Sequence, residues 1–417
     1  MTRPAAGTGR EVAGGILPPW IWLFFALYLG WGLPGQIDAI RGWIDAFSGD
    51  GDYAPLVGRT SLVMLRLLVV VEMLPVALLV AGVLSVAFPG LRARWVEWRL
   101  GLRPADDRPV IAEMQRFVDG YAPGTRLRFG LGGGRLARVY PAGWRRARVA
   151  VFPALVRMWR GDPADRRAAQ AVLLHEIAHV RQGDHPVVGL GSPFVWLIRI
   201  WAPVFVLLGL LPILVYFVIA PDALATVVSA QVVLVSTRPL RVLVLPVAAL
   251  WLSELSADRL PVQILGPDAL RRALAPGGAG KLRSLLSHPP AAVRRRASTP
   301  GPARTLALLA AWPSAIVLSL LIALATAAPA YLLIGASASG TADGLLKGAH
   351  AFLADARLAI AVIVVVLLAW PRLVHAWTRW WVPAAPSLPS DVPAVYRTAA
   401  ILPAALLIAS FVPPPAT

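Results

Sequence analysis

Long apolar stretches alternate with polar, arginine-rich segments along most of this chain. A helix needs about 20 residues to cross the hydrocarbon core of a bilayer, and several of these stretches reach that length. We interpret seven of them as membrane-spanning helices. They are Pro19–Leu33, Ser61–Phe88, Ile200–Ala220, Leu224–Thr237, Thr305–Ile334, Leu358–Trp370 and Ala394–Val412. The fourth and sixth are the shortest, so we expect tilting or extension by flanking turns there.

A folded domain is predicted to begin in the polar region Leu91–His185. Val110–Tyr121 has apolar residues at helical spacing, whereas Arg126–Phe129 and Arg148–Phe152 alternate as strands do. Gly132–Gly134 indicates a turn between these strands. A hairpin turn is favoured over a phosphate-binding loop, because no strand–GxGxxG–helix context surrounds the glycines.

Composition supports a membrane protein, since 57% of the 417 residues are hydrophobic and only 15% are charged. The net charge of +18 could suggest a nucleic-acid partner, but the arginines lie mainly between apolar stretches. The positive-inside rule places the Arg-dense loops Leu91–Gly183 and Ser256–Arg304 in the cytoplasm and the Asp-rich segment Pro34–Thr60 outside. We therefore expect a lipid bilayer as partner and no nucleic acid.

The strongest chemical motif is His175-Glu176-Ile177-Ala178-His179. On a helix, residues i and i+4 lie on one face, so both imidazoles can bind one zinc ion. Glu176 would then act as general base and acid beside the open coordination position. Asp162-Pro163 is a suitable helix start and Gly183 a suitable end, so the motif is predicted to lie on one well-bounded helix.

A catalytic zinc normally has a third protein ligand, and Glu254 is our candidate. It follows the apolar run Val242–Leu252, and the chain has no cysteine that could supply a thiolate. Asp258, one helical turn further on, could accept the free ring N–H of His175 or His179 and fix the metal-binding tautomer. His185 lies beyond Gly183, and we expect it to be solvated at the helix end.

Here the chain resembles the HtpX-like membrane zinc metalloproteases, the gluzincin family that also contains the CAAX prenyl endopeptidases. The resemblance covers roughly Leu91–Arg296 and depends on four linked features. They are Leu174–Val180 with Asp184 after it, an intervening membrane hairpin, Glu254 through Asp258, and Ser287-His288-Pro289-Pro290 followed by Arg294. The resemblance implies that His288 stabilises the tetrahedral oxyanion and that Arg294 is a supporting charge.

The sequence departs from the family pattern in two places. The family's edge strand before the zinc helix usually contains Asn-Ala, whereas the nearest counterpart here, Ala137–Pro141, has no Asn. The three spans after Thr305 exceed the simplest family layout.

These observations predict a mainly α, multi-pass membrane protein with about seven transmembrane helices and a cytoplasmic α+β zinc domain built from two sequence segments. We expect five regions. They are 1–90 with two spans, 91–190 with the HExxH helix, 191–238 as a transmembrane hairpin, 239–302 with the ExxxD and His-Pro-Pro elements, and 303–417 with three spans.

The expected function is a zinc metalloendopeptidase of the cell membrane, with one zinc per chain, a cytoplasmic active site and polypeptide substrates that are membrane-associated or misfolded. The alternative is a zinc-containing membrane sensor of the antibiotic-sensing receptor type, with little or no turnover. That type usually appends an extracellular ligand-binding domain, and no segment here is long enough to form one. The His-Pro-Pro element also favours the protease.

Overall fold

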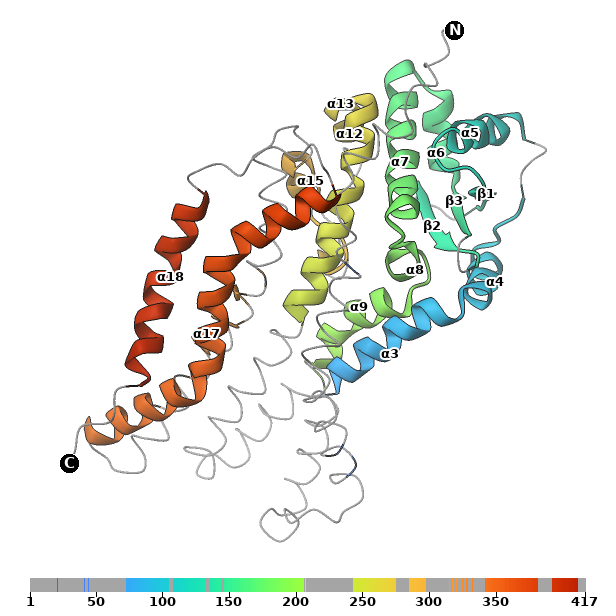
Figure 1. Cartoon of the computed structure of the whole chain (residues 1–417). Coiled ribbons are helices and arrows are strands. Elements are labelled where there is room, and N and C mark those ends of the chain that lie inside the picture. Colours follow the sequence, from blue (N-terminus) through green and yellow to red (C-terminus); the bar gives the residue numbers. More distant parts are fainter. Residues whose placement is uncertain are drawn as a thin grey trace.

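A computed structural model of the chain describes eight continuous segments together with isolated positions. The segments are 73–104, 108–131, 136–143, 146–205, 243–274, 285–297, 342–381 and 392–411. Within them the protein is mainly helical, with one small sheet beside the HExxH helix (Figure 1).

Three short strands form a mixed sheet in the order β1-β3-β2. Strand β1 (Arg126–Phe129) pairs parallel with β3 (Ala147–Val151), and β2 (Ala137–Pro141) pairs antiparallel with β3 at the opposite edge. The predicted hairpin between the first and last of these strands is therefore wrong, because parallel neighbours cannot be joined by a tight turn. The antiparallel neighbours are β2 and β3 instead, and just beyond their ends Ala142 N–H donates to Arg146 O at 2.7 Å. The triple glycine itself lies outside the described residues.

One face of the sheet carries the main core of the domain. Helices α5 (Pro109–Asp119), α6 (Pro153–Arg160) and α7 (Pro163–Gln182) pack there, burying Met114, Val149 and Leu173 completely. The helix predicted at Val110–Tyr121 is confirmed as α5. The opposite face, with Tyr140 and Phe152, packs against α4 (Pro89–Leu100). Helices therefore cover both faces of the sheet.

Helix α7 begins and ends where the sequence predicts. The Asp162 carboxylate accepts a hydrogen bond from Asp165 N–H at 2.7 Å, and Pro163 occupies the first turn. Gly183 has φ of 69°, a left-handed conformation that glycine adopts without strain from a Cβ atom. These two ends hold His175, Glu176 and His179 in one rigid helix.

A second helix reaches the same place from far along the chain. Residues 243–257 are helical, Asp258 forms a turn, and α12 (Arg259–Leu265) and α13 (Pro267–Ala273) follow and pack on α7. Figure 1 shows this yellow helix beside the green α7. Glu254 therefore lies beside the HExxH motif, although about 70 residues of sequence separate the two.

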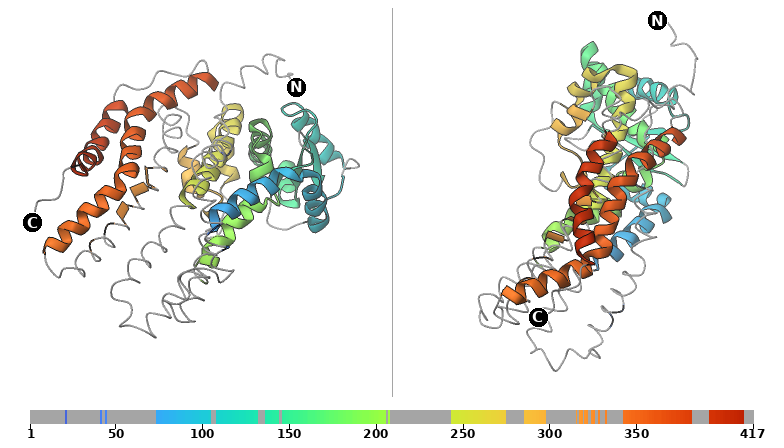
Figure 2. Two further views of the ribbon diagram at one scale, coloured as in Figure 1. Left: turned by 60° about the horizontal axis from the view of Figure 1, so that its bottom comes forward. Right: turned by 60° about the vertical axis from the view of Figure 1, so that its left-hand side comes forward.

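Apolar helices extend away from the domain. Helix α3 (Leu74–Ala87) packs along α9 (Pro193–Phe205), and α17 (Ala342–Trp381) packs along α18 (Val392–Ala409). Both pairs can be followed in the left view of Figure 2. Buried contacts of Ile363 and Leu367 with Ala400 join the second pair. The short α8 (His185–Val188) lies between α7 and α9.

Within the described segments, no single helix is both long enough and apolar enough to cross a bilayer by itself. Two bent pairs meet the length and composition criteria together: Val76–Ala87 with Pro89–Leu100, bent by 86°, and Gly344–Ala354 with Ala356–Ala369, bent by 54°. The seven-span topology remains a prediction. The expected span Leu224–Thr237 and most of Pro19–Leu33, Ile200–Ala220 and Thr305–Ile334 lie outside the described residues. The first part of Ser61–Phe88 also lies outside them.

Candidate metal centre

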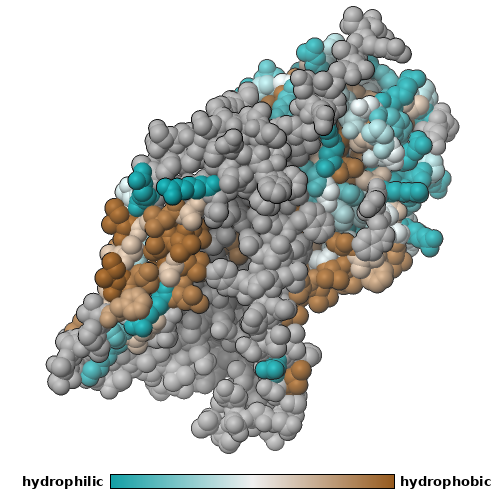
Figure 3. Space-filling view, viewed as in Figure 1, coloured by the Kyte–Doolittle hydropathy of each residue, from teal (hydrophilic) through white to brown (hydrophobic). Residues whose placement is uncertain are grey.

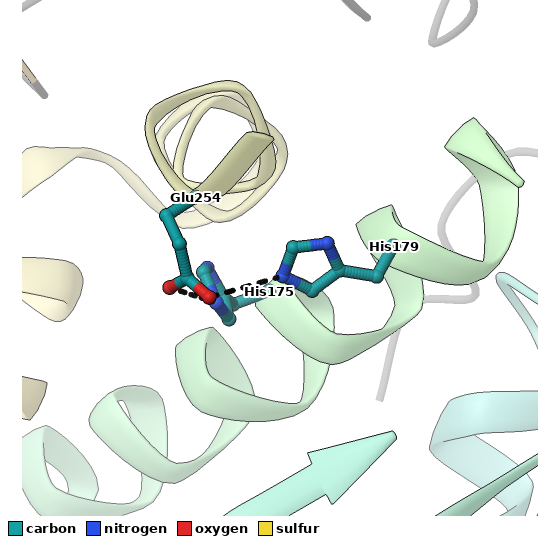
Figure 4. A group of neighbouring side chains, drawn as sticks. All are labelled: His175, His179 and Glu254. Carbon is teal, nitrogen blue, oxygen red and sulfur yellow. Dashed lines mark ion pairs between the residues drawn. The ribbon is translucent and has the colours of Figure 1, made fainter. Parts of the chain in front are cut away.

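His175, His179 and Glu254 converge on one buried point between α7 and the 243–257 helix (Figure 4). One ligand atom from each lies within 4.8 Å of the others. His175 Nε2 is 3.5 Å from Glu254 Oε2, and His179 Nε2 is 3.8 Å from Glu254 Oε1. Tetrahedral ligands at about 2.1 Å from a zinc ion are roughly 3.4 Å apart, so this spacing is close to that of a metal site.

Unpartnered buried atoms of two of these residues fit a cation. His179 Nε2 and Glu254 Oε2 are buried and have no hydrogen-bond partner among the described residues. An unsatisfied buried acceptor is costly, and a metal ion placed between these atoms would satisfy both. The group could therefore hold a metal ion, and two imidazoles with one carboxylate form a donor set that suits zinc.

Each imidazole has its own carboxylate on the side away from the ligand cluster. His175 Nδ1 is 2.9 Å from Asp258 Oδ1, and His179 Nδ1 is 3.1 Å from Asp184 Oδ1. A carboxylate at Nδ1 keeps the proton there and leaves Nε2 free as a ligand. The sequence predicted Asp258 for one of the two rings, and the structure assigns it to His175.

Asp184 is the partner that the sequence analysis did not assign. It is 1% exposed and also accepts a hydrogen bond from the Ser253 hydroxyl on the opposite helix. The signal was present in the sequence, because Asp184 directly follows the glycine that ends the HExxH helix. The direction in which the chain turns after Gly183 was not readable from the sequence.

The carboxylates dominate the electrostatics of the cluster. Burial opposes the charged form of His175, but the neighbouring carboxylates of Asp258 and Glu254 outweigh burial and raise its pKa to about 9. Burial similarly opposes ionisation of Glu254, yet the neighbouring His288 and His175 hold its pKa well below the ordinary value. The pocket thus favours a positive charge between the imidazoles and Glu254, which a divalent metal would supply.

We expect Asp184→Asn to weaken zinc binding by about 10–100-fold, the usual cost of losing a partner of a metal-bound histidine. An amide lacks the charge that holds the His179 proton on Nδ1. Titration against a competing chelator measures the affinity, with Asp119→Asn at the end of α5 as a control. Unchanged affinity in Asp184→Asn would show that His179 needs no such partner.

Glu176 is buried beside the edge strand. Its Oε2 accepts a hydrogen bond from Val139 N–H at 2.7 Å, and Val139 O accepts from Leu190 N–H at 2.8 Å. Both backbone groups of Val139 therefore face away from β3. The segment Ala137–Pro141 is a strand at the sheet edge, and in this structure its central N–H orients the Glu176 carboxylate.

Arg294, on α15 (Ala291–Ala297), forms a two-point ion pair with Asp258. Its Nε donates to Asp258 Oδ2 at 2.8 Å and its Nη2 to Oδ1 at 2.6 Å. Two parallel hydrogen bonds fix the carboxylate plane as a single lysine amine could not. Arg294 also lies beside the cluster itself, with Nη1 at 3.9 Å from Glu254 Oε2 and Nη2 at 3.4 Å from His175 Nδ1.

His288 lies next to the third ligand, with Nδ1 at 2.9 Å from Glu254 Oε1. Its Nε2 is 2.6 Å from Arg138 Nη2 and 3.2 Å from Arg199 Nη2. Arginine has only donors, so Nε2 must accept, and we infer that the ring proton lies on Nδ1. Nδ1 is close to the Glu254 carboxylate but is not aligned for a hydrogen bond with it. Burial and the charge of Arg138 lower the pKa of His288 to about 4, which keeps the ring neutral.

Arg138 is a second residue that sequence reasoning missed. It extends from the edge strand β2, its side chain is 32% exposed, and its Nη1 lies 3.7 Å from Glu254 Oε1. The family resemblance indicated an edge strand at Ala137–Pro141, but only the tertiary structure shows that this arginine reaches the metal cluster.

His185 is not solvated as predicted. Its side chain is buried in α8, and burial lowers its pKa to about 4. The chain turns back at Gly183 and packs α8 against α3 and β2, which removes His185 from water.

Comparisons of the sequence with protein-family models and curated proteins, and of the fold with solved structures, give no match. The candidate metal centre therefore depends on the residues of this chain alone.

Proposed function

We propose that this chain is a membrane-bound zinc metalloendopeptidase. The observation that carries the proposal is the buried convergence of His175, His179 and Glu254, with a glutamate directly after the first histidine. Two imidazoles, one carboxylate and an adjacent Glu base form the constellation used for zinc-assisted peptide hydrolysis. The separate carboxylate for each imidazole supports a site preorganised for catalysis.

In this mechanism a bound zinc ion supplies Lewis-acid polarisation of the scissile carbonyl and of the attacking water. Glu176 accepts one proton from that water as the C–O bond forms, and later delivers it to the leaving amine as the C–N bond breaks. Val139 N–H holds Glu176 Oε2, so Oε1 is the oxygen we assign to proton transfer. Asp258 and Asp184 keep His175 and His179 in the tautomer with a free Nε2.

Negative charge that develops on the carbonyl oxygen needs a positive partner, and we assign Arg138 to it. His288 is engaged by Glu254 through one ring nitrogen and by arginine through the other. Arg138 is partly exposed, carries a permanent charge and lies beside the third ligand. The assignment gives Arg138 the electrostatic role that the family resemblance implied for His288.

Arg138→Gln is expected to lower kcat/KM by about 10²-fold while zinc content stays at that of the parent protein. The matched control is Arg126→Gln, an exposed arginine on β1 of the same sheet. Peptide-cleavage kinetics together with metal analysis distinguish the outcomes. Loss of zinc from Arg138→Gln would assign the residue to support of Glu254, and unchanged kinetics would remove it from the mechanism.

The proposed substrates are membrane-associated or misfolded polypeptides, and the proposed location of the catalytic domain is the cytoplasmic face of the cell membrane. Apolar helices α3 and α9 start next to the domain, which favours substrates at the bilayer surface. The arginine content of the segments that build the domain favours the cytoplasmic side.

The direct test is cleavage of an unfolded protein such as casein by the purified, detergent-solubilised chain. Activity should depend on zinc, be lost on treatment with a chelator and return when zinc is added back. Cleavage that persists without metal would contradict the proposal.

A further inference from the structure

Helix α4 exposes one apolar and cationic face. The residues of this exposed face are Leu91, Arg94, Trp95, Trp98 and Arg99, at spacings of three and four that bring them to one side of the helix. Leu91 is 67% exposed, Trp95 43% and Trp98 80%. The opposite side buries Ala93 and Val96 against the sheet. Three large apolar side chains on one exposed face of a well-packed helix require an explanation.

The acidic and basic side chains of α4 lie on different sides of the helix. Its single acid, Glu97, turns to the sheet and accepts hydrogen bonds from Arg148 and, at 2.8 Å, from the Tyr140 hydroxyl. Arg94 and Arg99 remain on the exposed face, and the Arg99 guanidinium lies 5.0 Å from the centre of the Trp95 ring. Tryptophan with arginine on one helix face is typical of helices that lie in the headgroup region of a bilayer.

The angle between α3 and α4 would let α4 lie along a bilayer surface. It meets α3 at a bend of 86°, so when α3 points into a bilayer α4 lies parallel to the surface. Val83 on α3 is 59% exposed, and Phe88 at the junction of α3 and α4 is 57% exposed, so the apolar surface continues from α4 onto α3. In Figure 3 the brown surface follows the course of α3 and the start of α4 beneath the more polar domain.

A buried arginine fixes this arrangement to the candidate metal centre. The Arg92 guanidinium donates to Leu190 O at 3.0 Å and Ser85 O at 3.3 Å, and also to the carbonyls of Pro186 and Gly189. These carbonyls belong to α3 and to the segment that follows α7. The bend between α3 and α4 is therefore tied by hydrogen bonds to the segment that directly follows the HExxH helix.

We propose that α4 lies in the interface of a bilayer containing anionic phospholipid, with Trp95 and Trp98 at the boundary of headgroups and acyl chains and with Arg94 and Arg99 on lipid phosphates. Charge complementarity favours lipid over a second copy of the chain, because a second copy of this face would bring like charges together. The helix sets the height and tilt of the metal centre above the bilayer. The inference is independent of whether the chain hydrolyses peptides.

The absence of cysteine allows a sharp test in the full-length chain. Single-cysteine variants Trp98→Cys and Leu91→Cys carry a spin label, and the protein is reconstituted into nanodiscs of phosphatidylcholine with phosphatidylglycerol. The control is Asp268→Cys on α13, where the side chain is 90% exposed. Power-saturation measurements with oxygen and with an aqueous nickel chelate then give the depth of each label.

We expect labels at 91 and 98 to lie about 5–10 Å below the phosphates, shielded from nickel, whereas the label at 268 remains fully accessible to it. Replacing Arg94 and Arg99 by Gln should make the label at position 98 more accessible to nickel. The increase should be larger in discs that contain phosphatidylglycerol than in discs of phosphatidylcholine alone. Nickel access at 98 equal to that at 268 would overturn the proposal, as would failure of the chain to associate with the discs. Dipolar coupling between labels at 98 of two chains would assign the face to a second copy instead.

Discussion

Glu176→Gln is expected to keep one zinc per chain and to lose peptide hydrolysis, with kcat falling by about 10²–10⁴-fold. Glutamine retains the shape of the side chain and an oxygen that can accept the Val139 N–H hydrogen bond, so α7 and the three ligands should stay in place. The amide cannot accept a proton from water near neutral pH. The change removes only proton transfer, which metal analysis and casein cleavage on the same preparation will show.

The control for this prediction is Glu113→Gln. Glu113 belongs to α5 of the same domain, where its carboxylate bonds to Arg166 and to the Trp159 ring nitrogen. That variant should keep both zinc and activity. Equal cleavage by Glu176→Gln and the parent chain would remove Glu176 from the chemistry, and loss of zinc would show that its effect is structural.

Glu254→Gln is expected to lose zinc, with an affinity decrease greater than the 10–100-fold caused by removing a partner of a metal-bound histidine. An amide oxygen is a weaker ligand for zinc than a carboxylate, and the two imidazoles alone hold the ion poorly. The stability of the parent chain should rise by about 2.7 kcal/mol when free zinc is 100 times the dissociation constant. The variant should show almost no such gain, which thermal unfolding with and without zinc will measure.

Ser256→Ala provides the matched control two residues away on the same helix. Its hydroxyl is buried and has no hydrogen-bond partner among the described residues, so removing it should affect neither zinc nor stability by much. A Glu254→Gln variant that binds zinc as tightly as Ser256→Ala would show that the third ligand lies elsewhere.

Local patterns predicted the parts of the site that depend on one helix. The spacing of His175 and His179 fixes their common face, and Asp162 and Gly183 mark the ends of α7, because helix geometry and capping act over a few residues. Glu254 and Asp258 were also predicted, although a carboxylate pair alone usually marks a solvated helix face. The pair follows an expected membrane hairpin that starts just after the HExxH motif, and the polar segments that flank such a hairpin return to the same side of the bilayer. The structure brings the predicted ligands together.

The sequence did not predict the contacts between segments that lie far apart along the chain. The parallel pairing of β1 with β3 depends on the sheet order, and the approach of Arg138 to Glu254 joins residues 116 positions apart in the sequence. Asp184 depends on the direction of a single turn after Gly183. Each of these contacts is decided by tertiary packing, which acts between segments that no local pattern connects.

Zinc K-edge X-ray absorption of the purified full-length chain tests the central claim most directly. We predict one zinc per chain, with two imidazole nitrogens and a carboxylate oxygen at about 2.0–2.2 Å, and a clear loss of the imidazole contribution in His179→Ala. Failure of the chain to retain zinc after reconstitution, or zinc bound without imidazole, would contradict the assignment of this site.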